Sequence, residues 1–308
     1  MRFLYKTIGL GLNLWSLVAP RSAVRRVYTL FATPPKPVLR PKELAFLSTA
    51  RQVRRNAAGH EVVEYHWGPE EGPLVLLTYG WGYNAGRWRH FVPALTAAGF
   101  HVLAYDPPGH GLNQGPRYLN LVTNSAIQSD LLERYGPATA ILGHSFGGSA
   151  AVITVKNQPG LQRPLRMVVM ASFSNASRIF AEYRRHLGLW PALYHRMLHL
   201  IEHHVGMPVH AFDMARMSAS LGNVEALIVH DPTEKVTPFS NALRYQAYWP
   251  GSALLRAHGA GHHLGQTDIT NSIVQFLTEG ILPAAAEISQ QNLPADHDLV
   301  RFFAGMEV

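Results

Sequence analysis

The 308-residue sequence contains no cysteine and few charged residues, which make up 15% of the chain. The lack of cysteine excludes a disulfide scaffold, a thiol nucleophile and a zinc site with cysteine ligands, and it leaves the redox compartment undetermined. None of the 17 histidines lies in a His-Glu-x-x-His pattern or a similar ligand pattern. We therefore expect no metal ion and no cofactor.

Binding to nucleic acid also has little support in the composition. No basic run is interleaved with aromatic residues, so we expect no nucleic-acid partner. Hydrophobic residues make up 47% of the chain, which is enough for a large buried core and gives no sign of disorder. The net charge of +7 comes mostly from basic residues in the first 60 positions. These either face acidic lipid headgroups or form an ordinary solvated surface.

The N-terminal segment contains no apolar run long enough to cross a bilayer. The apolar stretch 8–19 is interrupted by Asn13 and Ser16, and it is too short and too polar to span. We predict that residues 1–20 form an amphipathic helix that docks on the body of the protein or lies on a membrane surface. A cleaved secretory signal is the alternative. The expected location is cytoplasmic, with peripheral membrane contact through this helix left open, and the oligomeric state is undetermined.

From Glu61 onward, strand and helix patterns alternate along the chain. The expected strands are 61–67 (an edge strand), 74–78, 102–105, 138–142, 167–170, 226–229 and 253–255. The expected helices are 88–98, 124–135, 149–156, 243–248 and 269–277. This alternation predicts an α/β protein with a mostly parallel central sheet and helices on both faces. In such sheets the reactive groups gather at the carboxyl ends of the strands.

The same patterns divide the chain into four parts. Residues 1–45 are predicted to form N-terminal helices, the second over 21–31, and a proline-rich connector. Residues 46–174 and 222–282 form the core. Residues 175–221 contain no strand pattern and are predicted to form a helical cap insertion, with helices over 179–187, 192–203 and 212–219. Residues 283–308 form a tail, in which 284–287 suggest a helix.

One motif stands out at the junction of a strand and a helix, namely Gly143-His-Ser145-Phe-Gly147. An apolar run leads into it and an Ala/Val/Ile-rich segment follows, so Ser145 is predicted at the apex of a very tight turn. Side chains at Gly143 and Gly147 would collide with the strand and helix that the turn brings together. A serine held there projects its hydroxyl above the sheet, where the backbone N–H groups of the helix also point.

Four segments together resemble the α/β-hydrolase superfamily, and within it the serine esterase and lipase-like members. They are Tyr-Gly-Trp-Gly at 79–82, Asp-Pro-Pro-Gly-His-Gly at 106–111, the motif around Ser145, and Gly-Ala-Gly-His at 259–262. The resemblance covers about 61–277 and follows the family's chain order of nucleophile, acid and histidine. It implies an α/β-hydrolase fold with a helical cap.

The resemblance also implies a catalytic triad headed by Ser145. His262 is the expected base, with His258 and His263 as less favoured neighbours. The expected acid is Glu234, which lies four residues before Pro238 as the family's acid does, and Asp231 on the same loop is the alternative. A serine hydroxyl needs such a base, and the base needs a carboxylate that orients it.

The resemblance assigns the oxyanion hole to the backbone N–H groups of Trp81 and Phe146. The chain has Tyr79-Gly80 where relatives commonly have His-Gly, so the tyrosine must shape this loop. The segment 106–111 is expected to be structural, with His110 packed rather than catalytic. No aspartate nucleophile of the dehalogenase kind is present, because Ser145 occupies the position.

The implied activity is hydrolysis of a small-molecule carboxylic ester through an acyl-enzyme. The aromatic and aliphatic residues of the cap suggest an apolar acyl or alcohol site of small to medium size. A thioesterase, lactonase, acyltransferase or aminopeptidase on the same fold is the alternative. A non-catalytic binding module is the alternative from another functional class.

Overall fold

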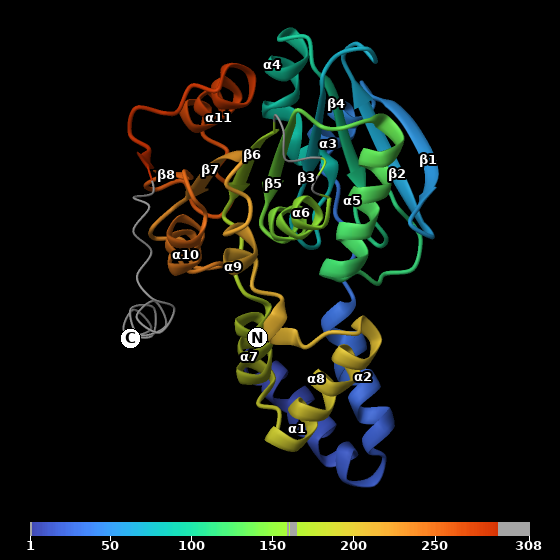
Figure 1. Ribbon diagram of the computed structural model, residues 1–308. Helices are drawn as coiled ribbons and strands as arrows, with labels where there is room; N and C mark the ends of the chain where they lie inside the picture. Colours follow the sequence, from blue (N-terminus) through green and yellow to red (C-terminus); the bar gives the residue numbers. More distant parts are fainter. Residues whose placement is uncertain (1, 159, 161–164, 289–308) are drawn as a thin grey trace.

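A nine-stranded sheet forms the centre of the computed structural model, which describes residues 2–158, 160 and 165–288 (Figure 1). The strands lie in the order β1-β2-β4-β3-β5-β6-β7-β8-β9. Their bounds are β1 Arg51–Ala57, β2 His60–Trp67, β3 Leu74–Thr78, β4 His101–Asp106, β5 Ala140–His144, β6 Leu165–Met170, β7 Val224–His230, β8 Ala253–Arg256 and β9 Glu287–Ile288. All pairs from β4 to β8 are parallel, whereas β1, β2 and β9 pair antiparallel at the two ends. The predicted mostly parallel sheet is confirmed.

Helices cover both faces of this sheet because its central strands are apolar on both sides. In β3, Leu74 and Leu76 pack into one core cluster, and Val75 and Leu77 pack into the other. The first cluster includes residues of α5 (Leu121–Tyr135), α6 (Phe146–Asn157), α9 (Met214–Ser218) and α10 (Ser240–Tyr248). The second includes residues of α3 (Pro41–Leu47), the 3-10 helix η1 (Ala85–His90), α4 (Val92–Ala97) and α11 (Thr267–Glu279).

Four further helices lie together at one end of the molecule, below the sheet in Figure 1. They are α1 (Arg2–Val18), α2 (Pro20–Ala32), α7 (Ala176–Leu187) and α8 (Pro191–Val205). We call these four helices the helical layer. Within it α2 packs against α8, and α1 packs against α2 and α7. The short 3-10 helix η3 (Val209–Ala211) leads from the layer toward α9. The N-terminal helices and the predicted cap therefore share one packed layer, and the division into domains stays a prediction.

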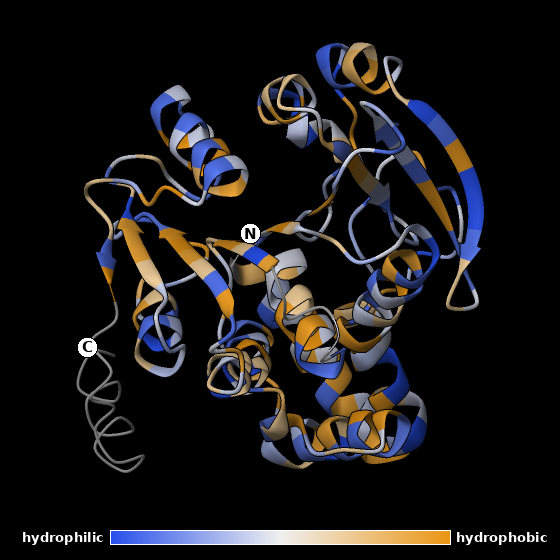
Figure 2. Ribbon diagram, turned by 45° about the horizontal axis from the view of Figure 1, so that its top comes forward, coloured by the Kyte–Doolittle hydropathy of each residue, from blue (hydrophilic) through white to orange (hydrophobic). Residues whose placement is uncertain are grey.

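The expectation that 61–67 forms an edge strand is wrong. Strand β1 pairs with β2 along its whole length, from Arg51 opposite His66 to Ala57 opposite His60, so β2 lies inside the sheet. Strand β1 is largely exposed and rich in arginine, and Figure 2 shows it as a mainly hydrophilic edge. It therefore lacks the apolar run that predicts a strand from sequence. Charged edge strands of this kind also discourage pairing with another chain.

Two helix predictions also need correction. The single helix expected over 88–98 is split into η1 and α4, with Pro93 in the first turn of α4, where proline starts a helix but cannot continue one. The helix expected over 284–287 is a turn followed by β9, whose Glu287 carboxylate accepts hydrogen bonds from the Arg256 guanidinium. The rest of the predicted tail, 289–308, lies outside the described residues.

The turn that carries Ser145 is as tight as its glycines predict. Ser145 has φ 53° and ψ −125°, a left-handed backbone conformation that non-glycine residues rarely adopt. A Cβ atom at Gly147 would lie 2.5 Å from the carbonyl oxygen of Tyr79 and 2.6 Å from the carbonyl carbon of Thr78. A Cβ atom at Gly143 would overlap the backbone of Gly148. Helix α6 thus approaches β3 and β5 at backbone contact distance.

We expect Gly147→Ala to lower the free energy of unfolding by about 2–3 kcal/mol, because the added methyl group meets backbone atoms that cannot rotate away. Urea unfolding monitored by circular dichroism measures the change. Gly11→Ala is the matched control, because no atom lies within 4 Å of a Cβ placed at that position of α1. It should leave stability unchanged or raise it by up to ~1 kcal/mol. Equal effects of the two substitutions would contradict the steric argument.

Candidate active site

Ser145 follows the last residue of β5 and immediately precedes α6. Its Oγ lies 3.2 Å from Nε2 of His262, a residue 117 positions away in the sequence. The serine is half-buried at the base of a cavity rather than packed into the core. The hydroxyl is thus both accessible and within hydrogen-bonding distance of an imidazole, which is the geometry that proton removal from serine requires.

His262 lies on the loop that follows β8, and this loop is held from two sides. The N–H of Gly261 donates to the Asp231 carboxylate at 2.6 Å. The main-chain carbonyl of His262 accepts a hydrogen bond from Nε2 of His144 at 2.8 Å. The imidazole Nδ1 lies 3.3 Å from Oε1 of Glu234. The ring is therefore fixed between the serine hydroxyl and a carboxylate.

The Glu234 side chain is buried, and its carboxylate is surrounded by donors. It accepts hydrogen bonds from the backbone N–H groups of Val236 and Thr237, at 2.8 and 2.9 Å, and from the Thr237 hydroxyl. Nε2 of His230 also donates to it at 3.1 Å. Burial alone would raise the pKa of Glu234, but the hydrogen bonds from His230, His262 and Thr237 outweigh it and hold this pKa below its usual range. The group is thus an anion that can accept Nδ1–H of His262.

Asp231, the alternative acid, makes different contacts. Its carboxylate accepts hydrogen bonds from the N–H and hydroxyl of Thr233 as well as from the N–H of Gly261. The structure therefore brings Glu234 to the imidazole of His262 and Asp231 to the backbone of the loop that carries it. The catalytic role of either carboxylate stays a prediction.

The other histidines near this loop lie in different surroundings. The main-chain carbonyl of His263 accepts a hydrogen bond from the buried Arg87 guanidinium at 2.7 Å. The backbone N–H of His258 bonds to the carbonyl of Arg256. Ser145 lies within hydrogen-bonding distance of His262 Nε2, and no such contact joins it to either of these neighbours in the described residues. Arg87 is a buried group that no sequence pattern indicated, and its hydrogen bond to His263 is a further anchor of this loop.

The residues predicted to form the oxyanion hole both lie at the serine. Phe146 is the first residue of α6, where the backbone N–H groups have no partner within the helix. Gly80 lies so close to the nucleophile that a Cβ atom there would be 3.0 Å from Cβ of Ser145. The Trp81 and Phe146 rings contact each other edge to face, with centroids 5.2 Å apart. The role of their N–H groups as oxyanion donors stays a prediction.

The loop that carries Trp81 is tied to a buried carboxylate, Asp106, at the end of β4. The Tyr79 hydroxyl donates to it at 2.6 Å and the Tyr65 hydroxyl at 2.7 Å. The backbone N–H groups of Ala85 and Leu112 also donate to it. Burial raises the pKa of Asp106, against the effect of these hydrogen bonds. Tyr79 thus shapes the loop through a hydrogen bond, and the expectation that the segment around Asp106 is structural agrees with these contacts.

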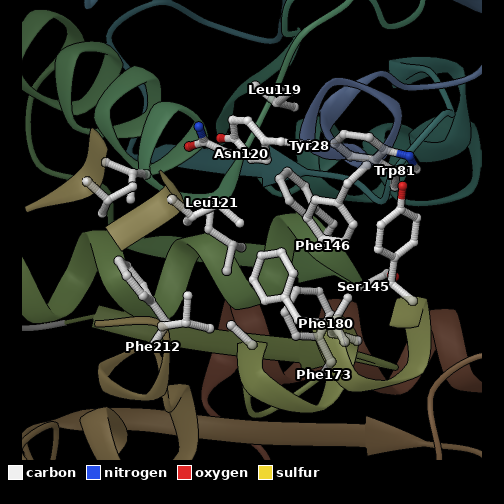
Figure 3. A pocket seen from close by; sticks show the side chains of 18 of the residues that line it. Tyr28, Trp81, Leu119, Asn120, Leu121, Ser145, Phe146, Phe173, Phe180 and Phe212 are labelled. Carbon is white, nitrogen blue, oxygen red and sulfur yellow. The ribbon is translucent and has the colours of Figure 1, made fainter. Parts of the chain in front are cut away.

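A cavity of about 400 Å³ opens above Ser145 (Figure 3). No charged side chain lies among the described residues that line it. Its walls are mainly apolar, with aliphatic side chains and aromatic ones that include Phe31, Phe146, Phe173, Phe180, Tyr183 and Phe212. The exposed side chains of Leu30, Val122 and Val236 lie where the cavity meets the surface.

Part of this cavity wall comes from the N-terminal helices, which the sequence had placed in a separate unit. Tyr28 and Phe31 of α2 line the cavity, and Phe31 packs on Phe180 of α7 with ring centroids 4.4 Å apart. The Tyr183 hydroxyl donates to the carbonyl of Val27 at 2.9 Å. The amphipathic pattern of 21–31 was a signal that this helix packs on something, but it did not reveal the partner.

The described residues contain no cluster of three or more His, Cys, Asp or Glu side chains suited to a metal ion. Within the same residues no helix is long and apolar enough to cross a membrane. The polar groups around Ser145 in this part of the chain are His262 and Glu234, the groups that hold the His262 loop, and the hydroxyl or amide groups of the cavity wall.

Two buried histidines beside the site should make stability depend on pH. Burial lowers the pKa of His110 to about 4 and holds that of His144 well below its usual range. Below pH 6.5 the unfolded chain binds protons at these positions and the folded chain does not. The free energy of unfolding should therefore fall as the pH drops from 6.5 to 5, by about 1–2 kcal/mol for each residue.

Urea unfolding at several pH values measures this loss. His110→Gln should show a shallower pH dependence than the unsubstituted protein, because one buried titrating group is removed. His203→Gln is the control, since His203 is exposed on α8. An unchanged slope in His110→Gln would contradict the role given to burial.

Comparison with known proteins identifies relatives of this chain. The family model described as alpha/beta hydrolase fold matches residues 73–198, which include Ser145 but neither Glu234 nor His262. Epoxide hydrolase A of Mycobacterium tuberculosis is 34% identical over 130 residues, which are 41% of this chain and 38% of that protein. Human monoglyceride lipase is 29% identical over 114 residues, 34% of this chain and 38% of the lipase. The matches therefore span about two fifths of each relative.

A solved structure extends the comparison to the fold. A meta-cleavage product hydrolase from Pseudomonas fluorescens superposes with a TM-score of 0.54 at 22% identity, over 74% of this chain and 98% of that chain. At this identity the likeness concerns the fold alone. It confirms the predicted fold class.

Proposed function

The chain belongs to the α/β-hydrolase superfamily, and on that premise we propose that it cleaves carboxylic esters through an acyl-enzyme. In this proposal Ser145 is the nucleophile, His262 the general base and Glu234 the group that orients the base. One observation carries it, namely the continuous hydrogen-bonded chain from Ser145 Oγ through His262 to Glu234, with steps of 3.2 and 3.3 Å.

The two steps follow from this arrangement. His262 Nε2 takes the proton of Ser145 as Oγ attacks the ester carbonyl, and the resulting imidazolium then protonates the leaving alcohol. Water that gives its proton to the same nitrogen attacks the acyl-enzyme and releases the acid. The Glu234 anion keeps Nδ1 protonated and stabilises the imidazolium in both steps. The N–H groups of Trp81 and Phe146 would hold the carbonyl oxygen as it becomes negative.

Ester cleavage fits the nucleophile better than the opening of an epoxide, which one of the relatives is named for. Attack of a serine oxygen on an epoxide carbon would give an ether. Water activated by the histidine could not cleave this ether, because the ether has no carbonyl carbon for the water to attack. Attack on an ester gives an acyl-enzyme that water can cleave.

The cavity favours a neutral, apolar substrate of small to medium size. Its lining carries aromatic and aliphatic side chains and no charged one among the described residues, so an apolar acyl or alcohol group gains free energy by leaving water there. An aminopeptidase would need a carboxylate for the substrate ammonium, and the lining offers none. A thioester or lactone would pass through the same acyl-enzyme, so these remain variants of the proposal.

We expect Ser145→Ala and His262→Ala to lower kcat for a short-chain p-nitrophenyl ester by roughly 10⁴-fold or more, because the first removes the nucleophile and the second removes the base that takes its proton. A fluorophosphonate probe should label the unsubstituted protein and not Ser145→Ala. The same preparation should show no serine-dependent turnover of an epoxide such as styrene oxide. Ester turnover that survives in Ser145→Ala would refute the proposed nucleophile.

The two candidate acids can be separated with a matched pair of amides. Glu234→Gln should lower kcat by roughly 10³–10⁴-fold, because an amide cannot stabilise the imidazolium. Asp231→Asn still offers an oxygen to the N–H of Gly261, so its effect should be far smaller. Steady-state kinetics on the same ester give both values. A larger loss in Asp231→Asn than in Glu234→Gln would reverse the assignment.

The wall formed by α2 should influence substrate size. Phe31→Ala removes a ring that packs on Phe180, so kcat/KM should shift toward longer acyl chains in a series of p-nitrophenyl esters. Trp190→Ala is the control, because Trp190 is an exposed aromatic of the helical layer that does not line the cavity. The same chain-length profile in both variants would place the acyl site elsewhere.

A further inference from the structure

Helix α1 packs on the protein through a narrow face of Gly9, Leu12, Asn13 and Ser16, which is mostly small or polar. Gly9, Leu12, Asn13 and Ser16 are buried, and a Cβ atom at Gly9 would overlap the carbonyl of Leu187. The Asn13 amide donates to the carbonyl of Gly188 at 2.9 Å and accepts from the N–H of Trp190 at 2.9 Å. These contacts fix which side of α1 faces inward.

The apolar side of α1 therefore faces outward. Its exposed large hydrophobic side chains are Phe3, Leu4, Tyr5, Ile8, Leu10, Leu14, Trp15, Leu17 and Val18. Leu10, Leu14 and Leu17 follow helical spacing along one stripe and are 52%, 51% and 69% exposed. Exposed apolar side chains gathered along one helix in this way cost free energy in water and are typical of an interaction site.

The charges around this surface indicate what covers it. The first 40 residues contain seven basic residues and no Asp or Glu; the basic residues are Arg2, Lys6, Arg21, Arg25, Arg26, Lys36 and Arg40. Arg21, Arg25 and Arg26 are exposed on α2, in the same helical layer at the end of the molecule away from the sheet (Figure 1). A second copy of the chain would bring the same positive charge to the contact, whereas an anionic surface would neutralise it.

We propose that the exposed apolar face of α1, with the basic residues of α2, docks on the surface of an anionic lipid bilayer. Helices of this kind lie in the membrane interface, with their apolar side chains among the acyl chains and cationic side chains near the headgroups. Trp15 on α1 and Trp190 in the same layer are 42% and 41% exposed, and tryptophan is enriched at such interfaces. Helix α1 has 17 residues and lies on the bilayer without crossing it.

Docking through this layer would also place the cavity close to the lipid phase. Helix α2 supplies Tyr28, Leu30 and Phe31 to the cavity wall, and Leu30 is exposed where the cavity opens. Binding to lipid is nevertheless independent of the proposed chemistry, because none of the α1 residues contacts Ser145, His262 or Glu234.

The test is flotation of the full chain with vesicles of phosphatidylcholine, with or without phosphatidylglycerol. We expect the protein to float with the anionic vesicles, and Leu10→Glu/Leu14→Glu/Leu17→Glu to lower its partition coefficient roughly tenfold or more. The matched control is Leu44→Glu/Ile281→Glu/Ile288→Glu, which adds the same three charges at exposed aliphatic positions outside the helical layer. This control variant should bind the anionic vesicles more strongly than the α1 variant does.

Charge and folding are tested separately. Arg21→Gln/Arg25→Gln/Arg26→Gln should weaken binding to anionic vesicles, and high ionic strength should do the same. Ser145→Ala should bind as the unsubstituted protein does, so that a failure of the proposed chemistry leaves this result untouched. Equal urea midpoints for all variants would establish that they are folded.

Three results would overturn the proposal. The first is no flotation of the unsubstituted protein with either vesicle, and the second is equal binding of the unsubstituted protein to neutral and anionic vesicles. The third is a dimer, detected by light scattering, that the leucine-to-glutamate variant abolishes while vesicle binding is absent. That result would assign the surface to a second copy of the chain.

Discussion

The close approach of the α6 backbone to β3 and β5 is the constraint on which the site depends. No atom beyond Cα fits at Gly147, where Tyr79 and Thr78 leave no room, and Ser145 takes a left-handed conformation to make the turn. The strain is tolerated because the surrounding strands fix the chain on both sides. The close approach of α6 therefore brings the Ser145 hydroxyl, the first N–H groups of α6 and the loop after β3 within reach of one another.

Buried carboxylates organise the remaining loops at the same edge of the sheet. Asp106 is the last residue of β4, and it ties the loop of Trp81 through Tyr79 and Ala85. Asp231, just past β7, holds the backbone of the His262 loop, while Glu234 meets the ring itself. Each carboxylate accepts hydrogen bonds from backbone N–H groups of the loops around it. The loops that carry Trp81 and His262 are therefore held in place by hydrogen bonds between these carboxylates and the main chain.

The sequence predicted the features that local pattern determines. Buried parallel strands are continuous apolar runs, and the motif around Ser145 needs a strand before it and a helix after it, so these were found. Strand β1 was missed because its exposed arginines carry no apolar pattern, and Pro93 divided a helix that looked continuous. Glu234 and Asp231 lie three residues apart on one loop. Which of them contacts the His262 ring depends on the path of the loop backbone, which the sequence does not show.

Packing between distant segments was beyond such patterns. Nothing in the sequence of α2 shows that Phe31 meets Phe180, nearly 150 positions later, or that both line the same cavity. The inward polar face of α1 was equally hidden, because an amphipathic helix is expected to bury its apolar side. In α1 the face with Gly9 and Asn13 packs on the protein instead, through contacts with Leu187, Gly188 and Trp190.

The contribution of α2 to the cavity has a practical consequence for recombinant work. A shortened version that begins at the proline-rich connector would keep the sheet and the Ser145–His262 pair, yet it would lose Tyr28 and Phe31 and leave the aromatic rings of α7 open to water. Deleting the hydrophobic N-terminal residues to improve expression would therefore remove one wall of the cavity. A fusion tag is better placed at the other terminus.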